Sequence, residues 1–301
     1  MAISRAQLVK ELEPGLNALF GLEYKSYANE HAEIFDTESS DRAFEEEVML
    51  SGFANATVKP EGQGVQFDDA QETFTARYTN ETIALAFAIT EEAIEDNLYD
   101  RLASRYTKAL ARSMANTKQV KAAAVINNGY ATGFAGGDGQ PLFSTTHPTM
   151  AGTFSNRLTT ASQLNETSLE AALIQIAAMT DERGLLIAAQ GMKLVIPPAL
   201  QFVADRLMSS QGRTGTADND INAVRNMGMV PQGYAINHYF TNANRWMIKT
   251  DVPNGLKHLV RSPIKTSMEG DFDTGNVRYK ARERYVFGFS DPRGAFGSGN
   301  V

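Results

Sequence analysis

Two neighbouring segments of the chain, residues 73–79 and 82–89, alternate strictly between apolar side chains and polar or small ones. A period of two residues is typical of β-strands. Only Asn80 and Glu81 separate the segments, so we predict a long hairpin within residues 53–89. A two-stranded hairpin is marginally stable in water by itself. We therefore expect this one to lie on another surface.

A long helix is predicted to follow the strands. Thr90 is a suitable N-cap, and residues 91–127 contain neither proline nor glycine, which allows a helix of roughly 55 Å. Acidic residues gather near its start and basic residues near its end, in agreement with the helix dipole. Its large apolar residues recur every four positions, from Ile94 to Met114. Such a stripe winds round a helix, so this helix should contact different elements along its length.

The first 37 residues are typical of an arm without a core of its own. We predict a short helix to about Glu13, a break at Pro14-Gly15, and a second amphipathic piece. This piece carries Leu16, Leu19 and Phe20 on one face. The sequence then becomes polar and acidic. The apolar residues of the arm should therefore need another surface to cover them.

The remainder of the chain shows a mixed pattern, so the predicted fold class is α+β. Five glycines within residues 129–139 end the long helix. Helices are then predicted at 169–183 and 198–209, and strands at 193–196, 234–240, 245–250 and 277–289.

Composition narrows the class of protein. The 301 residues suit one large domain or two ordinary ones, and the absence of cysteine excludes disulfides and thiolate zinc sites. No apolar run approaches the roughly 20 residues that span a bilayer. We expect an intracellular soluble protein that makes no contact with membranes.

Charge is distributed unevenly along the chain. Residues 1–100 contain 21 acidic and 6 basic residues, a net charge of −15, whereas residues 101–301 carry +8. Segregation of this size indicates a binding partner or self-association. Ordinary variation along a chain is the alternative explanation.

The sequence contains no recognised catalytic motif. It lacks a phosphate-binding loop, a nucleophile elbow and a zinc-binding histidine pair. Residues 218–229 imitate a calcium loop, but Ala223 and Met229 occupy the places of its required glycine and glutamate. We therefore expect no catalytic, cofactor-binding or metal-binding residues, and no enzymatic activity.

Ser144 and His147, with Asp138 nearby, are the best candidates for a nucleophile, base and acid set. Their spacing carries little information, because catalytic triads are arranged in space and not in sequence. A loop that turns at His147-Pro148 explains the same residues. We favour that structural interpretation.

The last predicted strand has one basic face and one apolar face. Arg278, Lys280, Arg282 and Arg284 share the first, and Glu283 interrupts the second. Three interpretations remain open: a solvated face, a docking face for an acidic segment, and contact with nucleic acid. The third lacks interleaved aromatic residues, and the chain as a whole is acidic.

The order of these elements resembles the major capsid proteins of tailed bacteriophages. Local sequence also resembles the major head subunits of Mu-type phages. The similar segments are Pro14-Gly15-Leu16-Asn17-Ala18-Leu19-Phe20-Gly21-Leu22, Phe44-Glu45-Glu46-Glu47, Ala88-Ile89-Thr90-Glu91-Glu92-Ala93, Pro141-Leu142-Phe143-Ser144-Thr145-Thr146-His147-Pro148, and Arg282-Glu283-Arg284 through Asp291-Pro292-Arg293-Gly294.

The resemblance implies the phage major capsid fold. Its parts would be an N-terminal arm with the entry to the P-domain (1–52), an E-loop hairpin (53–89), the P-domain spine helix (90–128), an A-domain (129–260), and a closing P-domain strand that returns to the A-domain (261–301). The arm and E-loop would lie on neighbouring subunits.

The implied function is the icosahedral shell around the genome of a tailed double-stranded DNA phage, built from hexamers and pentamers. The alternative is an encapsulin-like nanocompartment. The implied location is the virion capsid, assembled in the host bacterial cytoplasm. Partners would be other copies of the chain, a separate scaffolding protein, a portal and a decoration protein, with non-specific contact to packaged DNA.

Subunit contacts are expected at apolar arm residues and at oppositely charged segments. The candidates are Leu16, Leu19, Phe20, Glu45, Glu46, Glu47, Asp68, Asp69, Glu72, Arg278, Lys280, Arg282 and Arg284. Some relatives crosslink covalently, and Lys59, Asn276 and Glu283 are the conceivable participants here. Because Arg282 and Arg284 flank Glu283, we expect its carboxylate to be ionised and paired. We predict no crosslink.

Overall fold

The computed structural model describes residues 5–90, 92, 99–213, 220–271 and 275–298. Its helices are α1 (Arg5–Ser26), α3 (Tyr99–Asn127), α4 (Glu166–Ala177), α5 (Gln201–Ser209) and α6 (Ala223–Asn226), with 3-10 turns η1 (Glu30–Glu33), η2 (Pro198–Leu200) and η3 (Pro292–Gly294). Its strands are β1 (Asp36–Ser39), β2 (Phe44–Leu50), β3 (Glu72–Thr79), β4 (Glu81–Ile89), β5 (His147–Thr149), β6 (Gly152–Phe154), β7 (Gly191–Ile196), β8 (Tyr234–Ile236), β9 (Met247–Thr250), β10 (Leu256–Gly270), β11 (Val277–Phe289) and β12 (Ala295–Gly297).

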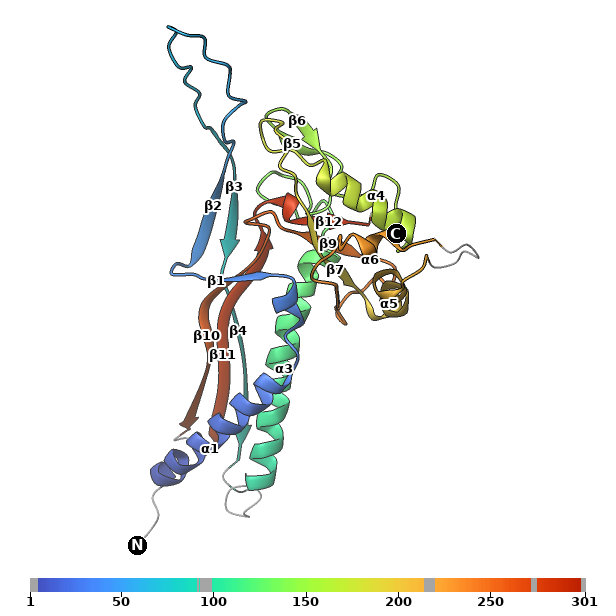
Figure 1. Ribbon diagram of the computed structural model, residues 1–301. Coiled ribbons are helices and arrows are strands. Elements are labelled where there is room, and N and C mark those ends of the chain that lie inside the picture. The colour runs from blue at the N-terminus through green and yellow to red at the C-terminus, as the bar shows by residue number, and fades with distance from the viewer. Residues whose placement is uncertain (1–4, 91, 93–98, 214–219, 272–274, 299–301) are drawn as a thin grey trace.

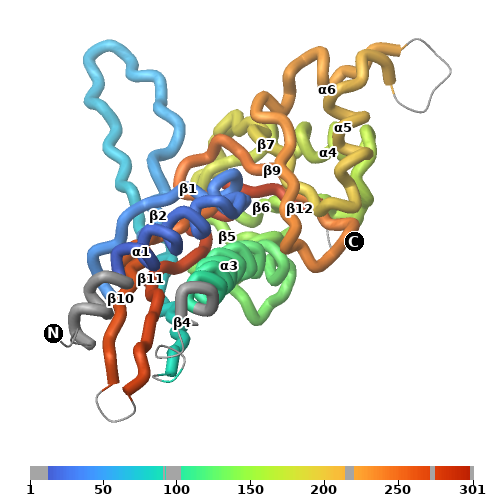
Figure 2. The backbone as a smooth tube through the Cα atoms, turned by 90° about the horizontal axis from the view of Figure 1, so that it is seen from below, coloured from blue at the N-terminus to red at the C-terminus, as the bar shows by residue number. Residues whose placement is uncertain are grey.

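The molecule has an elongated lobe, a rounded lobe and one projecting hairpin (Figure 1). The elongated lobe is a sheet in the order β1-β10-β11-β4, with α1 and α3 on one face. We call it the P-domain. The rounded lobe, the A-domain, contains the sheet β12-β9-β7-β8 with α4, α5 and α6 around it. Seen from below, the A-domain and the hairpin extend in different directions (Figure 2).

Apolar burial holds each lobe together. In the P-domain, Leu110 and Met114 of α3 pack against Ile89 and Tyr279 of the sheet. In the A-domain, the fully buried Trp246 packs with α4, α5 and the sheet. Helix α4 begins at a capping box, in which Asn165 accepts a hydrogen bond from the backbone of Ser168.

The predicted hairpin between residues 73–79 and 82–89 is wrong. Strand β3 pairs with β2, whereas β4 pairs antiparallel with β11, from Ile89↔Val277 to Glu81↔Tyr285. Asn80 is buried between β3 and β4, and its side chain donates to Ser40 Oγ at 2.7 Å. The alternation had identified both strands correctly but could not identify their partners.

The hairpin that projects from the molecule consists of β2, β3 and residues 51–71 between them, and we call it the E-loop. Strands β2 and β10 were not predicted from the sequence. The hydrophobic period is weak in β2 because three glutamates occupy its centre. Strand β10 contains Pro263 and two register shifts, which obscure its alternation.

The predicted break at Pro14-Gly15 is also wrong, since α1 continues through Pro14. The apolar residues of the arm are covered by another surface, as expected, but that surface belongs to the same subunit and not to a neighbour. Leu16 and Phe20 are 8% and 3% exposed, and they pack on α3 and the P-domain sheet of the same subunit. Burial of this face favours a continuous helix more strongly than proline opposes it.

The predicted spine helix is present as α3. Its predicted start, residues 90–98, lies largely outside the described residues. The winding stripe is visible further along: Leu110 and Met114 are buried, whereas Tyr106 is 48% exposed and its ring packs 5.7 Å from that of Phe87. Toward its end α3 meets other elements, since Ile126 packs with Phe143 and Phe35.

Candidate assembly surfaces

The E-loop presents a long stretch of chain that its own subunit does not cover. Every residue from Phe53 to Glu72 is exposed. Residues 51–72 carry four acidic side chains and a single basic one, Lys59. The acidic residues are Glu61, Asp68, Asp69 and Glu72.

Four apolar side chains in this stretch had not been predicted as contact residues. Phe53, Val58, Val65 and Phe67 are 60%, 93%, 68% and 97% exposed. Large apolar side chains gathered without cover mark a surface that another molecule buries. A usable signal was present in the sequence, because Val65 and Phe67 alternate with polar residues inside a glycine-rich stretch.

Charged residues at the root of the E-loop bind within the subunit. Glu47 lies 2.5 Å from Lys257 of β10, and Ser290 donates a hydrogen bond to the same carboxylate. Burial of Lys257 favours the neutral amine, yet hydrogen bonds to Glu47 and Glu38 raise its pKa overall. Tyr78 in turn hydrogen-bonds to Ser290. Glu47 therefore fixes the hairpin to the P-domain.

The other acidic candidates differ in availability. Glu45 is occupied, because it accepts hydrogen bonds from Ser40 Oγ at 2.9 Å and from two backbone amides, which lower its pKa. Glu46 is exposed and lies 3.7 Å from Arg77. Asp68 accepts a hydrogen bond from the backbone N–H of Ala54 at 2.7 Å, and this bond lowers the pKa of Asp68.

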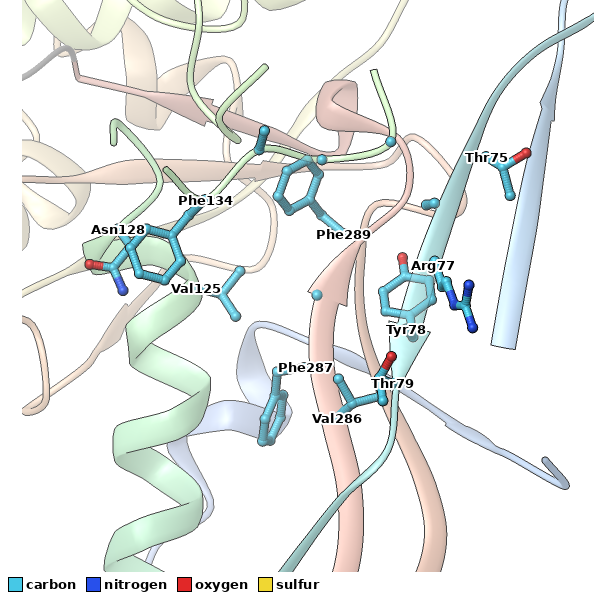
Figure 3. Close-up of a pocket in the computed structure, with 15 residues that line it drawn as sticks. Thr75, Arg77, Tyr78, Thr79, Val125, Asn128, Phe134, Val286, Phe287 and Phe289 are labelled. Carbon is cyan, nitrogen blue, oxygen red and sulfur yellow. The ribbon is translucent and has the colours of Figure 1, made fainter. Parts of the chain in front are cut away.

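A groove of about 500 Å³ opens at the root of the E-loop (Figure 3). The end of α3 forms one side, residues 75–79 of β3 form the other, and residues 286–289 of β11 form the floor. Gly137 lies so close to β3 that a Cβ would come within 2.6 Å of the carbonyl of Thr75. Neither a carboxylate nor a histidine is among the residues that line the groove.

The P-domain sheet has one face without helices. Arg278, Lys280 and Arg282 are exposed on it and Arg284 is half-buried, as the alternation predicted. In the register of the sheet, the exposed Ala84, Ala86 and Ala88 of β4 lie beside them, and Lys265 of β10 lies beside Arg282. We call Lys265, Arg278, Lys280, Arg282 and Arg284 the basic face.

Glu283 points to the opposite face and is 1% exposed beneath α1 and α3. Its carboxylate lies 3.3 Å from both Lys118 Nζ and Tyr24 Oη. The expected partners Arg282 and Arg284 lie on the other face of the strand, so Lys118 is the cation that pairs with it. Burial raises the pKa of Glu283, and Lys118 only partly opposes that effect. A carboxylate enclosed in this way is poorly placed to assist a crosslink between subunits.

Two histidines lie next to this ion pair. The rings of His31 and His258 are 5.1 Å apart, and Gln119 Nε2 lies 2.9 Å from Nδ1 of His31. Burial, together with the charge of Lys118, lowers the pKa of His31 to about 4 and that of His258 to about 3. Both rings are therefore neutral at pH 7 and behave as core side chains.

The candidate catalytic set does not assemble. His147 is fully buried and its Nδ1 lies 2.5 Å from Asp138, but its Nε2 faces Asn156 at 3.1 Å. Ser144 Oγ instead bonds to Gln140 at 3.2 Å. The histidine has no nucleophile to activate. The turn expected at His147-Pro148 is wrong, because both residues lie in β5 and the turn follows at Met150-Ala151. This arrangement is structural.

The described part of the chain shows neither a metal site nor a membrane-spanning helix. No group of three or more histidine or acidic side chains in it could hold a metal ion. None of its helices is long and apolar enough to cross a membrane.

Comparison with known proteins identifies the family and the fold. A family model described as phage capsid protein matches residues 72–297. The capsid of cyanophage P-SCSP1u is similar, with a TM-score of 0.56 at 14% identity over 88% of this chain and 85% of that one. The procapsid of bacteriophage JBD30 gives 0.54 at 15% identity, over 99% and 77%.

The same fold occurs in the virus-like particle of Pyrococcus furiosus, with a TM-score of 0.52 at 11% identity over 94% of this chain and 97% of that one. No curated protein sequence matches this chain. The family model covers well over half of the residues, from β3 to β12. This chain therefore belongs to the phage capsid protein family, and it is a structural component of the virion and not an enzyme.

Proposed function

We propose that copies of this major capsid protein form hexamers and pentamers that close into an icosahedral shell around phage DNA. The observation that carries the proposal is the E-loop, because twenty consecutive exposed residues include Val58 and Phe67 without any cover in their own subunit. Burial of such apolar surface drives association. A neighbouring subunit would supply the missing surface.

The contact is heterologous. A projecting hairpin and the surface that receives it are different parts of the chain, so each subunit gives one contact and takes another, and such contacts close into rings. The resemblance to capsid proteins implies that the E-loop lies on a neighbour, and the projection of the hairpin in Figure 1 supports this.

Further partners are proposed on the same basis. Similarity to a subunit of the JBD30 procapsid favours assembly through a precursor shell. For that shell we propose a separate scaffolding protein and a portal, and for the finished shell a decoration protein. Contact with packaged DNA would be non-specific. The narrower likeness to Mu-type head subunits stays a prediction.

Electron microscopy of the expressed protein, combined with measurement of its nucleic-acid content, tests the proposal. We expect closed shells of uniform size, and DNA within shells recovered from phage-producing cells. Shells that enclose protein cargo and no genome would favour the encapsulin-like alternative. A chain that stays monomeric at high concentration, with scaffold present, would overturn the proposal.

A further inference from the structure

The basic face carries more positive charge than its own subunit neutralises. Among the described residues, Arg278 pairs with Asp271, but Lys265, Lys280, Arg282 and Arg284 form no ion pair. The side chains beside them are Ala84, Ala86 and Ala88 on β4 and the exposed Glu269 on β10, which lies opposite Arg278. Alternate residues of a strand are about 7 Å apart. The cations therefore form a regular row, bordered by small apolar side chains.

The E-loop carries a complementary excess of negative charge. In the described part of the chain, the carboxylates of Glu61, Asp69 and Glu72 form no ion pair, since the contact of Asp69 with Arg183 uses its backbone carbonyl. The apolar Val58, Val65 and Phe67 lie among them and are exposed. Like the basic face, this segment combines unpaired charge with uncovered apolar surface, but its charge has the opposite sign.

These two surfaces cannot meet within one subunit. Strand β11 starts at the far end of the P-domain and runs toward the root of the E-loop, which then projects further in the same direction (Figure 1). Arg278 and the E-loop tip thus lie at opposite ends of the molecule. The strand alone is about 40 Å long.

We propose that the acidic E-loop of one subunit docks on the basic face of a second copy, and that this charge match selects the neighbour and its register. The inference rests on the proposed shell. Asp69 and Glu72 would approach Lys280, Arg282 and Arg284 of the second copy. The apolar tip residues would cover the alanines of β4. Paired opposite charges favour the correct register, and like charges reject incorrect ones.

A second copy fits the basic face better than DNA does. No aromatic side chain lies among the cations, and the exposed alanines offer nothing to phosphate. The chain as a whole carries −7, which opposes DNA binding outside a local patch. The E-loop supplies both the negative charge and the apolar side chains that would complement this surface.

A charge exchange tests the pairing. Lys280→Glu with Arg282→Glu reverses the basic face, and Asp69→Lys with Glu72→Lys reverses the E-loop. We expect each double variant to assemble about tenfold more slowly than the wild-type chain, measured by light scattering on unassembled subunits, because about 1.4 kcal/mol corresponds to a factor of ten. All four substitutions in one chain should restore most of the rate.

The control is Arg206→Glu with Arg225→Glu, which makes the same change in net charge on exposed A-domain residues. It should assemble at nearly the wild-type rate, and an equal loss would overturn the proposal by showing that net charge alone matters. Circular dichroism and thermal unfolding verify that each variant is folded. A misfolded variant is replaced by Lys280→Gln with Arg282→Gln, for which a smaller loss is expected.

The outcomes separate this inference from the function on which it rests. If the wild-type chain forms no shells, the proposed function fails. If wild-type and basic-face variants form shells at equal rates, or the fourfold variant gives no rescue, only the charge match fails. Normal shells that retain less DNA in the basic-face variant would assign this surface to nucleic acid and overturn the inference.

Discussion

At the scale of single residues, the buried pair of Lys118 and Glu283 links α3 to the P-domain sheet. We expect Lys118→Met to lower the free energy of unfolding by roughly 3–5 kcal/mol, because it leaves a buried carboxylate without its cation. Chemical denaturation of the unassembled subunit measures this. Lys121→Met on the same helix is the control, since its partner Glu81 is exposed and the loss should be at most about 1 kcal/mol. Equal losses would contradict the burial of Glu283.

The neutral histidines beside that pair predict a pH dependence. The folded-state pKa values of His31 and His258, about 4 and 3, lie below the ordinary value of 6.5. The unfolded chain therefore binds more protons between these values, so stability is complete above about pH 6.5 and falls as the pH is lowered toward 4. Each histidine contributes at most about 1.4 kcal/mol per pH unit.

Thermal unfolding between pH 7 and pH 4.5 measures that dependence. Lys118 disfavours protonation of both rings, and His31 also disfavours protonation of His258. His258→Gln should reduce the dependence. The exposed His238, which binds Glu30 at 2.6 Å, provides the control His238→Gln. An unchanged slope in His258→Gln would show that this ring titrates equally in both states.

At the scale of elements, the arm helix is expected to be docked before assembly. Phe20→Ala should weaken the docking of α1 by about 3–5 kcal/mol, because Phe20 is buried against α3 and Tyr279. The loss cannot exceed the free energy at which α1 detaches completely. Hydrogen exchange of α1 amides in unassembled subunits measures it. Leu22→Ala is the control, since Leu22 is 73% exposed. If Phe20→Ala affects only shells, the arm is covered by a neighbour instead.

The direction of the E-loop depends on close packing at its root. Gly137→Val should destabilise the subunit by about 1–3 kcal/mol and disturb the hairpin, because the added atoms would meet the backbone of β3. Gly133→Val in the same loop has open space and should be nearly neutral. Thermal unfolding and proteolysis of the E-loop compare the two. Equal behaviour would contradict the contact between Gly137 and Thr75.

At the scale of the whole molecule, charge and apolar burial should have separable effects on assembly. Raising the salt concentration from about 0.1 M to about 1 M shortens the screening length from about 10 Å to about 3 Å. We expect slower or misdirected assembly, because exposed ion pairs weaken. Finished shells should persist, since apolar burial supplies most of their adhesion. Light scattering and electron microscopy measure both, and rapid dissolution of finished shells by salt would contradict this division.

Local sequence patterns were sufficient to predict the elements with strong periodicity. The alternation over 277–289 gave β11, its basic face and the inward direction of Glu283, because a strand places successive side chains on opposite faces whatever its partner. The uninterrupted stretch before Gly129 gave α3. The order of elements and the short similar segments gave the family. Each of these features depends on a short stretch of sequence or on the order of such stretches along the chain.

Which elements contact one another depends on interactions between residues that are distant in sequence. Alternation describes the faces of a strand but carries no information on its neighbour, so the pairing of β4 with β11 and of β3 with β2 was beyond it. Helix α1 passes through Pro14 because contacts with α3 and the sheet outweigh local preference. Glu283 has a raised pKa because helices bury it, although the adjacent arginines suggested the reverse. Packing energy comes from residues distant in sequence, and it decided each of these cases.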